Sequence, residues 1–434
     1  KSMPFRPNNG FRGLLQWRGA TTILGAICVI ALIDIWHQHG HIKQRYEQQS
    51  CDKNLPPIDT QKDVIEARII DTSDPLHLHD DQLPDGTIKA ELKGKTHFSI
   101  EDLKICKAAL GGPWTRRSMS CEEDESCLAC AKPWNKEQAK RIINAYSDNE
   151  LKTKRKKFIA SHFPDKTKPI ILFATNKIHF PYMLNWACGC LNHFKEDMRP
   201  HTLVLAADHE TYDMATKAGF AVMDSVDFNV TPRHLNETWA REWNLTRNNV
   251  AKMGFPDSMA MQVACISELM EMDYTVISQD ADVVWRHDVR DYLQSSNLLN
   301  IHLATQMAPR ADAQGPVNTG FVFMRPSKIT RVFMRSLIEL LPLFYMRVDD
   351  QVVWNSLLRH YYFRQLHVSI LPRKQFLDLH DHTAEWVDEE TQILHTVSNS
   401  KKIRRLRTHN EWHFTESCPH WEKSLESLFP EWDL

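Results

Sequence analysis

The sequence predicts an α/β fold in which a mainly parallel sheet is flanked by helices. From residue 168 onward, short apolar runs alternate with helical patterns, and this alternation is typical of parallel sheets. The segment from 168 to 434 has about 265 residues, which is enough to bury a substantial core. Apolar residues make up 42% of the chain and charged residues 25%, which are ordinary values for a globular protein.

Net charge and hydropathy exclude two classes of protein. The chain carries 53 basic and 55 acidic residues, a formal net charge of −2, so it lacks the positive field that nucleic-acid binding needs. We therefore expect no nucleic-acid partner. The mean hydropathy of −0.45 excludes a protein with many membrane spans but permits a single one.

Residues 19–36 have the composition of such a span, since Asp34 near the far end is their only charge. At about 1.5 Å per residue they reach about 27 Å, enough for a thin bilayer. Basic residues precede the segment: Lys1, Arg6, Arg12 and Arg18. The positive-inside rule then places the N-terminus in the cytosol and the rest in the lumen. The prediction is a retained signal-anchor; a cleaved signal peptide and a buried core helix are the alternatives.

Two further features of the sequence agree with a lumenal location of the chain after residue 36. Asn229, Asn236 and Asn244 each begin an N-x-[ST] tripeptide and are candidate glycosylation sites. Four cysteines cluster ahead of the α/β domain: Cys106, Cys121, Cys127 and Cys130. In an oxidising compartment these favour disulfides over a zinc site, because only one C-x2-C pair is present.

These observations divide the chain into five parts. The order is a cytosolic tail (1–18), the anchor (19–36), a polar stem (37–100), a cysteine-containing helical accessory region (101–167) and the α/β domain (168–434). The basic run K-T-K-R-K-K at 152–157 is either a solvated helix face or a site for an acidic partner.

Within the α/β domain the apolar pattern predicts strands and helices in the following order. Strands are expected at 169–176, 202–207, 274–278, 301–307, 317–325 and 366–371, and helices at 258–272, 327–341 and 349–360. Asp257 is the expected N-cap of the first of these helices, after Pro256.

Two aspartates stand at the carboxyl end of the predicted strand 274–278. Asp280 and Asp282 are two residues apart, so their side chains share one side if the extended chain continues. Ligands of parallel sheets bind at this edge. Paired carboxylates suit Mg²⁺ or Mn²⁺, which then bridge to phosphates. A pair of surface aspartates in a turn is the alternative.

Several segments together resemble the nucleotide-diphospho-sugar transferases, in particular the xylosyl-, arabinosyl- and galactosyltransferases of plant and algal cell-wall synthesis. D-A-D-V-V-W at 280–285 resembles the family's D-x-D-V-V-W. N-T-G-F at 318–321 resembles its N-T-G-F strand, and D-Q-V-V-W-N at 350–355 its D-Q-x-x-x-N helix start. H-N-E-W at 409–412 resembles a late H-x-x-W element.

The resemblance implies a GT-A fold for residues 168–434 and assigns roles by position. It implies that Asp282 and His409 ligate the metal, and that Asp280 contacts the donor ribose or holds a metal-bound water. The donor sugar would lie beside Asn318, Thr319 and Gly320. Asp350 and Gln351 would sit near the anomeric carbon and the acceptor. For three of these, alternatives stay open: Asn318 shaping a turn, Asp350 capping a helix, and His409 being structural.

The implied reaction is sugar transfer from a UDP-sugar to a glycan or glycoprotein, with Mn²⁺ or Mg²⁺ and retention of configuration. A Golgi enzyme with a single-pass type II anchor is expected. The chain departs from the family pattern at His287, and it has no dense basic cluster for a diphosphate, although Arg247 and Lys252 could contribute. The rival hypotheses are a GT-A-like protein that binds a glycan or a partner without turnover, and a metal-dependent phosphoesterase.

Overall fold

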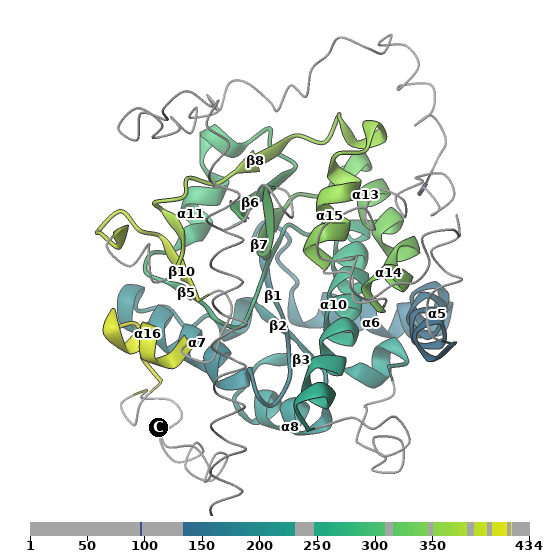
Figure 1. Cartoon of the computed structure of the whole chain (residues 1–434), viewed down its shortest axis with the longest axis horizontal. Helices are drawn as coiled ribbons and strands as arrows, with labels where there is room; N and C mark the ends of the chain where they lie inside the picture. The colour runs from purple at the N-terminus through teal and green to yellow at the C-terminus, as the bar shows by residue number, and fades with distance from the viewer. Residues whose placement is uncertain are drawn as a thin grey trace, which may run out of the picture. The chain divides into compact units, whose positions relative to one another are not determined.

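The structure is a computed structural model, drawn in Figure 1. It describes residues 96–97, 133–230, 247–308, 316–345, 350–379, 386–396, 402–414 and 418. All of these belong to one compact unit, 70–434. The predicted anchor, the cysteine cluster and two of the three predicted glycosylation sites, Asn236 and Asn244, lie outside the described residues. Among the helices that are described, none is long and apolar enough to cross a membrane.

A seven-stranded sheet forms the centre of this unit. Its order is β3 (Ala221–Asp224), β2 (Thr202–Ala206), β1 (Ile170–Thr175), β4 (Val276–Gln279), β7 (Val317–Met324), β6 (Leu303–Met307) and β8 (Val368–Ile370). The pairings β1–β2, β2–β3, β1–β4 and β6–β8 are parallel, whereas β7 runs antiparallel to both β4 and β6. The predicted mainly parallel sheet is confirmed.

Three short strands form a second sheet beside the first. β5 (Val283–Trp285) pairs antiparallel with β10 (Ile393–His395), which pairs in parallel with β9 (Phe376–Asp378). Because β5 follows β4 after three residues, this small sheet continues from the carboxyl edge of the large one. It therefore brings residues near 395 next to the aspartates of 280–282.

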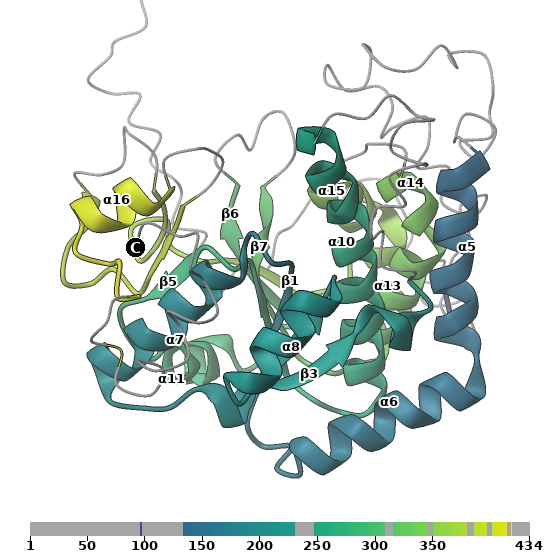
Figure 2. The ribbon, with the colours of Figure 1, turned by 90° about the horizontal axis from the view of Figure 1, so that it is seen from below.

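Helices cover both faces of the large sheet (Figures 1 and 2). One face carries α5 (Pro133–Ser147), α6 (Asn149–His162), α10 (Arg247–Glu271), α13 (Lys328–Glu339), α14 (Leu341–Tyr345) and α15 (Asp350–Leu358). The other carries α7 (Phe180–Phe194), α8 (His209–Lys217), α11 (Val289–Gln294) and α16 (Lys402–Thr408). Side chains of β1 alternate between the two cores: Ile170 and Leu172 enter the first, Ile171 and Phe173 the second.

The prediction for the start of α10 is wrong. The helix begins at Arg247, and both Pro256 and the expected N-cap Asp257 lie inside it. Proline removes one helical hydrogen bond, so a break is the ordinary expectation. Here α10 packs against β1, α5 and α13, and this burial outweighs the local cost.

The basic run of α6 is in part the predicted solvated face, since Thr153, Lys154 and Lys157 are exposed, but some of its charges have acidic partners within the chain. Arg155 is 1% exposed, and its guanidinium lies 2.5 Å from the carboxylate of Glu268 in α10. Lys154 pairs with Asp227 at 2.6 Å. Charges taken out of water need such partners, so Arg155 fastens α6 to the core. Lys154 and Lys157 stay exposed to solvent.

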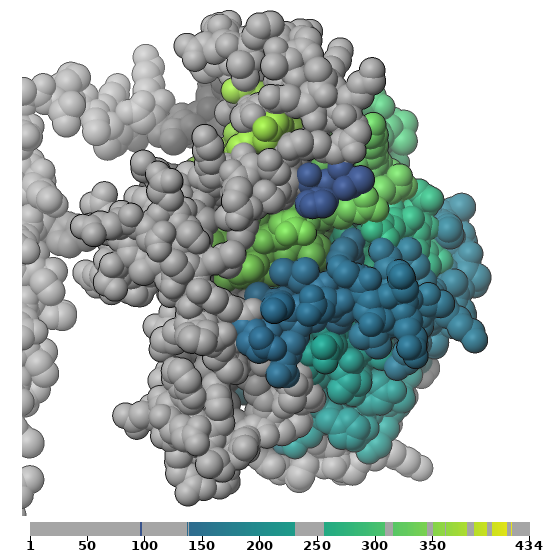
Figure 3. Space-filling model, turned by 90° about the vertical axis from the view of Figure 1, so that its right-hand side faces the viewer, coloured from purple at the N-terminus to yellow at the C-terminus, as the bar shows by residue number. Residues whose placement is uncertain are grey.

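Glu271, at the end of α10, is the centre of this network. Lys152 and Lys156 of α6 lie 2.8 and 3.2 Å from its carboxylate, and Arg335 of α13 lies at 3.0 Å. Burial alone would raise the pKa of Glu271, but these cations lower it to about 2. Figure 3 shows the outer surface of α5 and α6, in blue, beside the green helices of this face.

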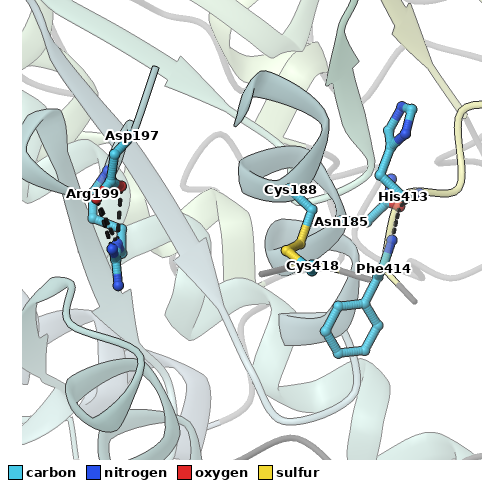
Figure 4. Close-up of a disulfide and its surroundings, with 7 residues drawn as sticks. All are labelled: Asn185, Cys188, Asp197, Arg199, His413, Phe414 and Cys418. Atoms are coloured by element: carbon cyan, nitrogen blue, oxygen red, sulfur yellow. Dashed lines mark hydrogen bonds and ion pairs between the residues drawn. A yellow bond between two sulfur atoms is a disulfide. The ribbon is translucent and has the colours of Figure 1, made fainter. Parts of the chain in front are cut away.

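A disulfide ties the C-terminal segment to the opposite face. Cys188 of α7 is bonded to Cys418, 230 residues later (Figure 4). Such a long closed loop restricts the unfolded chain strongly. The two described cysteines without a disulfide, Cys190 and Cys265, are buried.

The Glu271 network gives the protein a defined acid sensitivity. The pKa of Glu271 is lowered in the folded state, so its stabilisation is complete above about pH 4.5 and is lost as the pH falls towards 2. We expect Glu271→Gln to reduce the free energy of unfolding at pH 7 by about 3 kcal/mol and to flatten its fall below pH 4.5.

Urea unfolding at several pH values measures both effects. Glu137→Gln is the matched control, because Glu137 is 57% exposed and pairs with Arg141 within one helix. Equal pH profiles for Glu271→Gln and Glu137→Gln would contradict this account.

Candidate active site

The two predicted aspartates lie at the carboxyl edge of the large sheet. They occupy the turn between β4 and β5, where Asp280 N–H donates to Gly320 O of β7 at 2.9 Å. The Asp282 side chain is 6% exposed, whereas that of Asp280 is 39% exposed. Asp282 is therefore packed inside the protein while Asp280 is open to solvent, so a ligand can reach the pair, as a binding site requires.

A histidine from the small sheet completes the cluster. His395 ends β10 and pairs with Val283, the residue after Asp282. Its Nε2 lies 3.6 Å from Asp280 Oδ2 and 3.7 Å from Asp282 Oδ1. These three residues could hold a metal ion, because their ligand atoms all lie within 4.8 Å of one another.

Residues behind His395 fix the orientation of its ring. Gln306 Oε1 accepts a hydrogen bond from Nδ1 at 2.9 Å, while Gln306 Nε2 donates to the carbonyl of Phe376. Asp378 Oδ1 lies 3.5 Å from the same Nδ1. With its proton on Nδ1, the imidazole presents the lone pair of Nε2 to the aspartates, as metal-bound histidines do.

The electrostatics of the cluster favour a positive charge between the carboxylates. Burial lowers the pKa of His395, but Asp280, Asp282 and Asp378 outweigh it and raise the pKa. Burial likewise raises the pKa of Asp280, whereas His395 and Lys402 bring it below its usual value. Burial raises the pKa of Asp378 to about 6, against the lowering effect of His395. A divalent cation satisfies the same requirement, so the donor set fits one.

The predicted ligand His409 is not part of this cluster. It follows the end of α16, and the charges that act on it are those of Glu411 and Arg286. The physical reason is the pairing of β10 with β5, which places His395, fourteen residues before His409, beside the aspartates. A polar residue ending an apolar run, as His395 does at 393–395, is the signal that could have found it.

Lys402 and Thr396 are two further members that the sequence did not indicate. Lys402 of α16 donates to Asp282 Oδ2 at 2.6 Å, and Thr396 Oγ1 donates to the same oxygen at 3.2 Å. Burial would lower the pKa of Lys402, but Asp282 raises it. Asp282 thus presents one oxygen to Lys402 and the other to His395. His179, at the start of α7, also lies within range of these charges.

Asn318 and Gly320 of β7 pack against the residues of the cluster. Asn318 lies within β7 rather than in a turn, donates to Asp378 Oδ1 at 3.2 Å and accepts from Gly320 N at 2.9 Å. A Cβ on Gly320 would lie 2.3 Å from His395 Cε1 and 2.9 Å from Asp280 Oδ2. Glycine is therefore required here for the close approach of His395 and Asp280. Thr319, between them, is half-buried.

The D-Q-x-x-x-N segment forms the first turns of α15. Asn355 accepts from Val317 N at 3.0 Å and donates to Val317 O at 2.9 Å, which fastens α15 to the residue before Asn318. Asp350 and Gln351 are buried at the start of the helix. Their predicted roles near the anomeric carbon stay predictions.

The remaining predicted residues lie elsewhere. Lys252 belongs to the first half of α10, and its side chain is outside the described part. Asn229 is exposed after a short 3-10 helix, and its glycosylation stays a prediction.

Comparison with known proteins defines the class. Residues 198–406 match the nucleotide-diphospho-sugar transferase family. This part of the chain, which contains both aspartates, His395 and Lys402, is similar to that family. The protein is therefore an enzyme of the nucleotide-sugar-dependent glycosyltransferase class, and the resemblance in its motifs is confirmed.

Individual relatives are distant. A UDP-D-xylose:L-fucose alpha-1,3-D-xylosyltransferase of Arabidopsis thaliana is 24% identical over 278 residues, which are 58% of this chain and 72% of the relative. The glycosyltransferase GlyE of Streptococcus pneumoniae is 14% identical with a TM-score of 0.38, and the match covers 60% of this chain and 64% of GlyE. Mouse xyloside xylosyltransferase 1 is 11% identical with a TM-score of 0.33, over 54% of this chain and 98% of the mouse chain.

The contact of Gly320 with His395 makes a testable prediction. We expect Gly320→Ala to displace His395 and Asp280 and to lower the affinity for Mn²⁺ by at least about 10-fold. Titration of the protein with Mn²⁺, followed by electron paramagnetic resonance of the free ion, measures this affinity.

Gly219→Ala is the control, because Gly219 has a positive φ of 84° and is not part of the cluster. That change strains the backbone and lowers stability, yet should leave the Mn²⁺ affinity unchanged. An unaltered affinity in Gly320→Ala would show that the cluster does not bind the ion.

Proposed function

We propose that the protein transfers a pentose or galactose from a UDP-sugar to a glycan or glycoprotein, with Mn²⁺ or Mg²⁺ and retention of configuration. The observation that carries the proposal is the cluster of Asp280, Asp282 and His395 at the carboxyl edge of the sheet. Two carboxylates and one imidazole suit Mn²⁺, which accepts both oxygen and nitrogen ligands.

Asp280, Asp282 and His395 would hold the ion. When bound, it would act as a Lewis acid on the diphosphate leaving group. The residues around it position the donor. Lys402 lies against Asp282, so its ammonium can also donate a hydrogen bond to a diphosphate oxygen and offset the charge that develops on departure. Asn318 and Gln306 keep the His395 ring fixed through this step.

The sugar itself becomes oxocarbenium-like as the bond to the diphosphate breaks. Asp350 is the carboxylate that we assign to stabilise this charge, from the first turn of α15. The acceptor hydroxyl attacks on the same face as the departing diphosphate, whose oxygen takes the hydroxyl proton. This gives retention without a covalent intermediate on Asp350.

We further propose that the enzyme resides in the Golgi membrane as a single-pass type II protein with its catalytic domain in the lumen. Residues 19–36 and the basic residues before them support this orientation. The disulfide between Cys188 and Cys418 also supports it, because such bonds persist in oxidising compartments.

Ligand-dependent stability tests the proposed donor binding. With Mn²⁺ present, UDP at 100 times its Kd should raise the free energy of unfolding by about 2.7 kcal/mol. Asp282→Asn should abolish this gain and reduce sugar transfer at least about 100-fold. Asp288→Asn is the matched control, because Asp288 caps α11 and lies six residues further on.

A panel of radiolabelled UDP-xylose, UDP-arabinose and UDP-galactose then identifies the donor. Two results would contradict sugar transfer. Stabilisation by UDP that does not need the metal would indicate a protein that only binds, and phosphate release from simple esters without an acceptor would indicate a phosphoesterase.

A further inference from the structure

A second cluster of potential metal ligands lies at the other end of α7. His193, in the last turn of that helix, meets Glu411 and His413 of the C-terminal segment. About 20 Å of helix separates His193 from His179, which lies within range of the charges of Asp280 and Asp282, so the two clusters are distinct. None of the proposed catalytic steps uses this second cluster.

The three ligand atoms form a nearly equilateral triangle. His193 Nε2 and His413 Nε2 each lie 3.0 Å from Glu411 Oε2, and they lie 3.1 Å from each other. A triangle of this size leaves room for an ion at about 2.0–2.1 Å from each corner, the usual length of zinc bonds to imidazole and carboxylate. Two histidines and one glutamate are a known donor set for zinc.

Neighbouring groups hold these ligands in place. Arg286 Nε donates to Glu411 Oε1 at 2.8 Å, which leaves Oε2 directed at the histidines. Asn185 of α7 donates to Glu411 O at 3.0 Å and accepts from the backbone N–H of His413 at 2.5 Å (Figure 4). Gly189 lies under the His413 ring, where a Cβ would come within 2.8 Å of it. Outer partners of this kind orient the ligands of metal sites.

The cluster is closed on one side and open on the other. Glu411 is 3% exposed and His413 12%, whereas His193 is 28% exposed. A water molecule can therefore reach a fourth position beside His193, while the carboxylate stays shielded from solvent. Zinc accepts three protein ligands and one water.

We propose that His193, Glu411 and His413 bind a zinc ion that fastens the C-terminal segment to α7, beside the Cys188–Cys418 disulfide. His395 and Lys402 come shortly before Glu411 and His413 in the chain. The zinc ion would therefore anchor the part of the chain that completes the first cluster. The proposal does not depend on sugar transfer, because it concerns metal binding outside the active site.

Zinc content of the full-length protein tests the proposal. The background is the double variant Asp280→Asn/Asp282→Asn, which removes the first cluster as a zinc site. After equilibration with Zn²⁺ and desalting, we expect one zinc per chain by elemental analysis. Co²⁺ in its place should show the visible absorption of a four-coordinate site.

His193→Gln distinguishes zinc binding from a hydrogen-bonded triad. Its amide can still donate to Glu411, so a triad would be kept, but zinc affinity should fall at least about 100-fold. His413→Gln should give the same loss, and His209→Gln, at an exposed histidine of α8, should give none. The intact Cys188–Cys418 disulfide, measured by mass spectrometry, shows that a variant has folded. Absence of zinc in the background protein, or unchanged zinc in His193→Gln, would overturn the proposal.

Discussion

The candidate active site depends on one imidazole that has acidic side chains on both of its sides. His395 contacts Asp280 and Asp282 through Nε2, and Gln306 and Asp378 through Nδ1. A ring in this position has a single productive orientation, because rotating it would break the contacts on both sides. Its burial among carboxylates makes a cation the natural occupant of the space between the aspartates.

Several parts of the domain hold His395 and its partners in position. The pairing of β10 with β5 places His395, Asn318 holds Asp378, and Asn355 holds the start of β7. On the far face of the sheet, the Glu271 network fixes α6 and α13 against α10. The site is thus supported by regular elements, which position side chains more accurately than loops do.

The sequence predicted the large sheet well and the site only in part. Strands buried on both faces appear as continuous apolar runs, and β1, β2, β4, β6 and β7 were found for that reason. The half-buried β8 was also predicted, whereas β3 was missed. The strands β5, β9 and β10 have three residues each, too few for a period to show. His395 and Lys402 reach the aspartates only through this small sheet and α16. The polar end of the apolar run 393–395 could mark His395 as a candidate, but no local pattern links either residue to Asp280 and Asp282. The start of α10 was missed because tertiary packing overrides Pro256.

The nitrogen ligand of the bound ion is the most direct test of the central claim. Electron spin echo measurements on the protein with Mn²⁺ and UDP detect the ¹⁴N nucleus of an imidazole that coordinates the ion. The account predicts a ¹⁴N signal that disappears in His395→Gln and persists in His409→Gln. A signal that persists in His395→Gln and is lost in His409→Gln would contradict it.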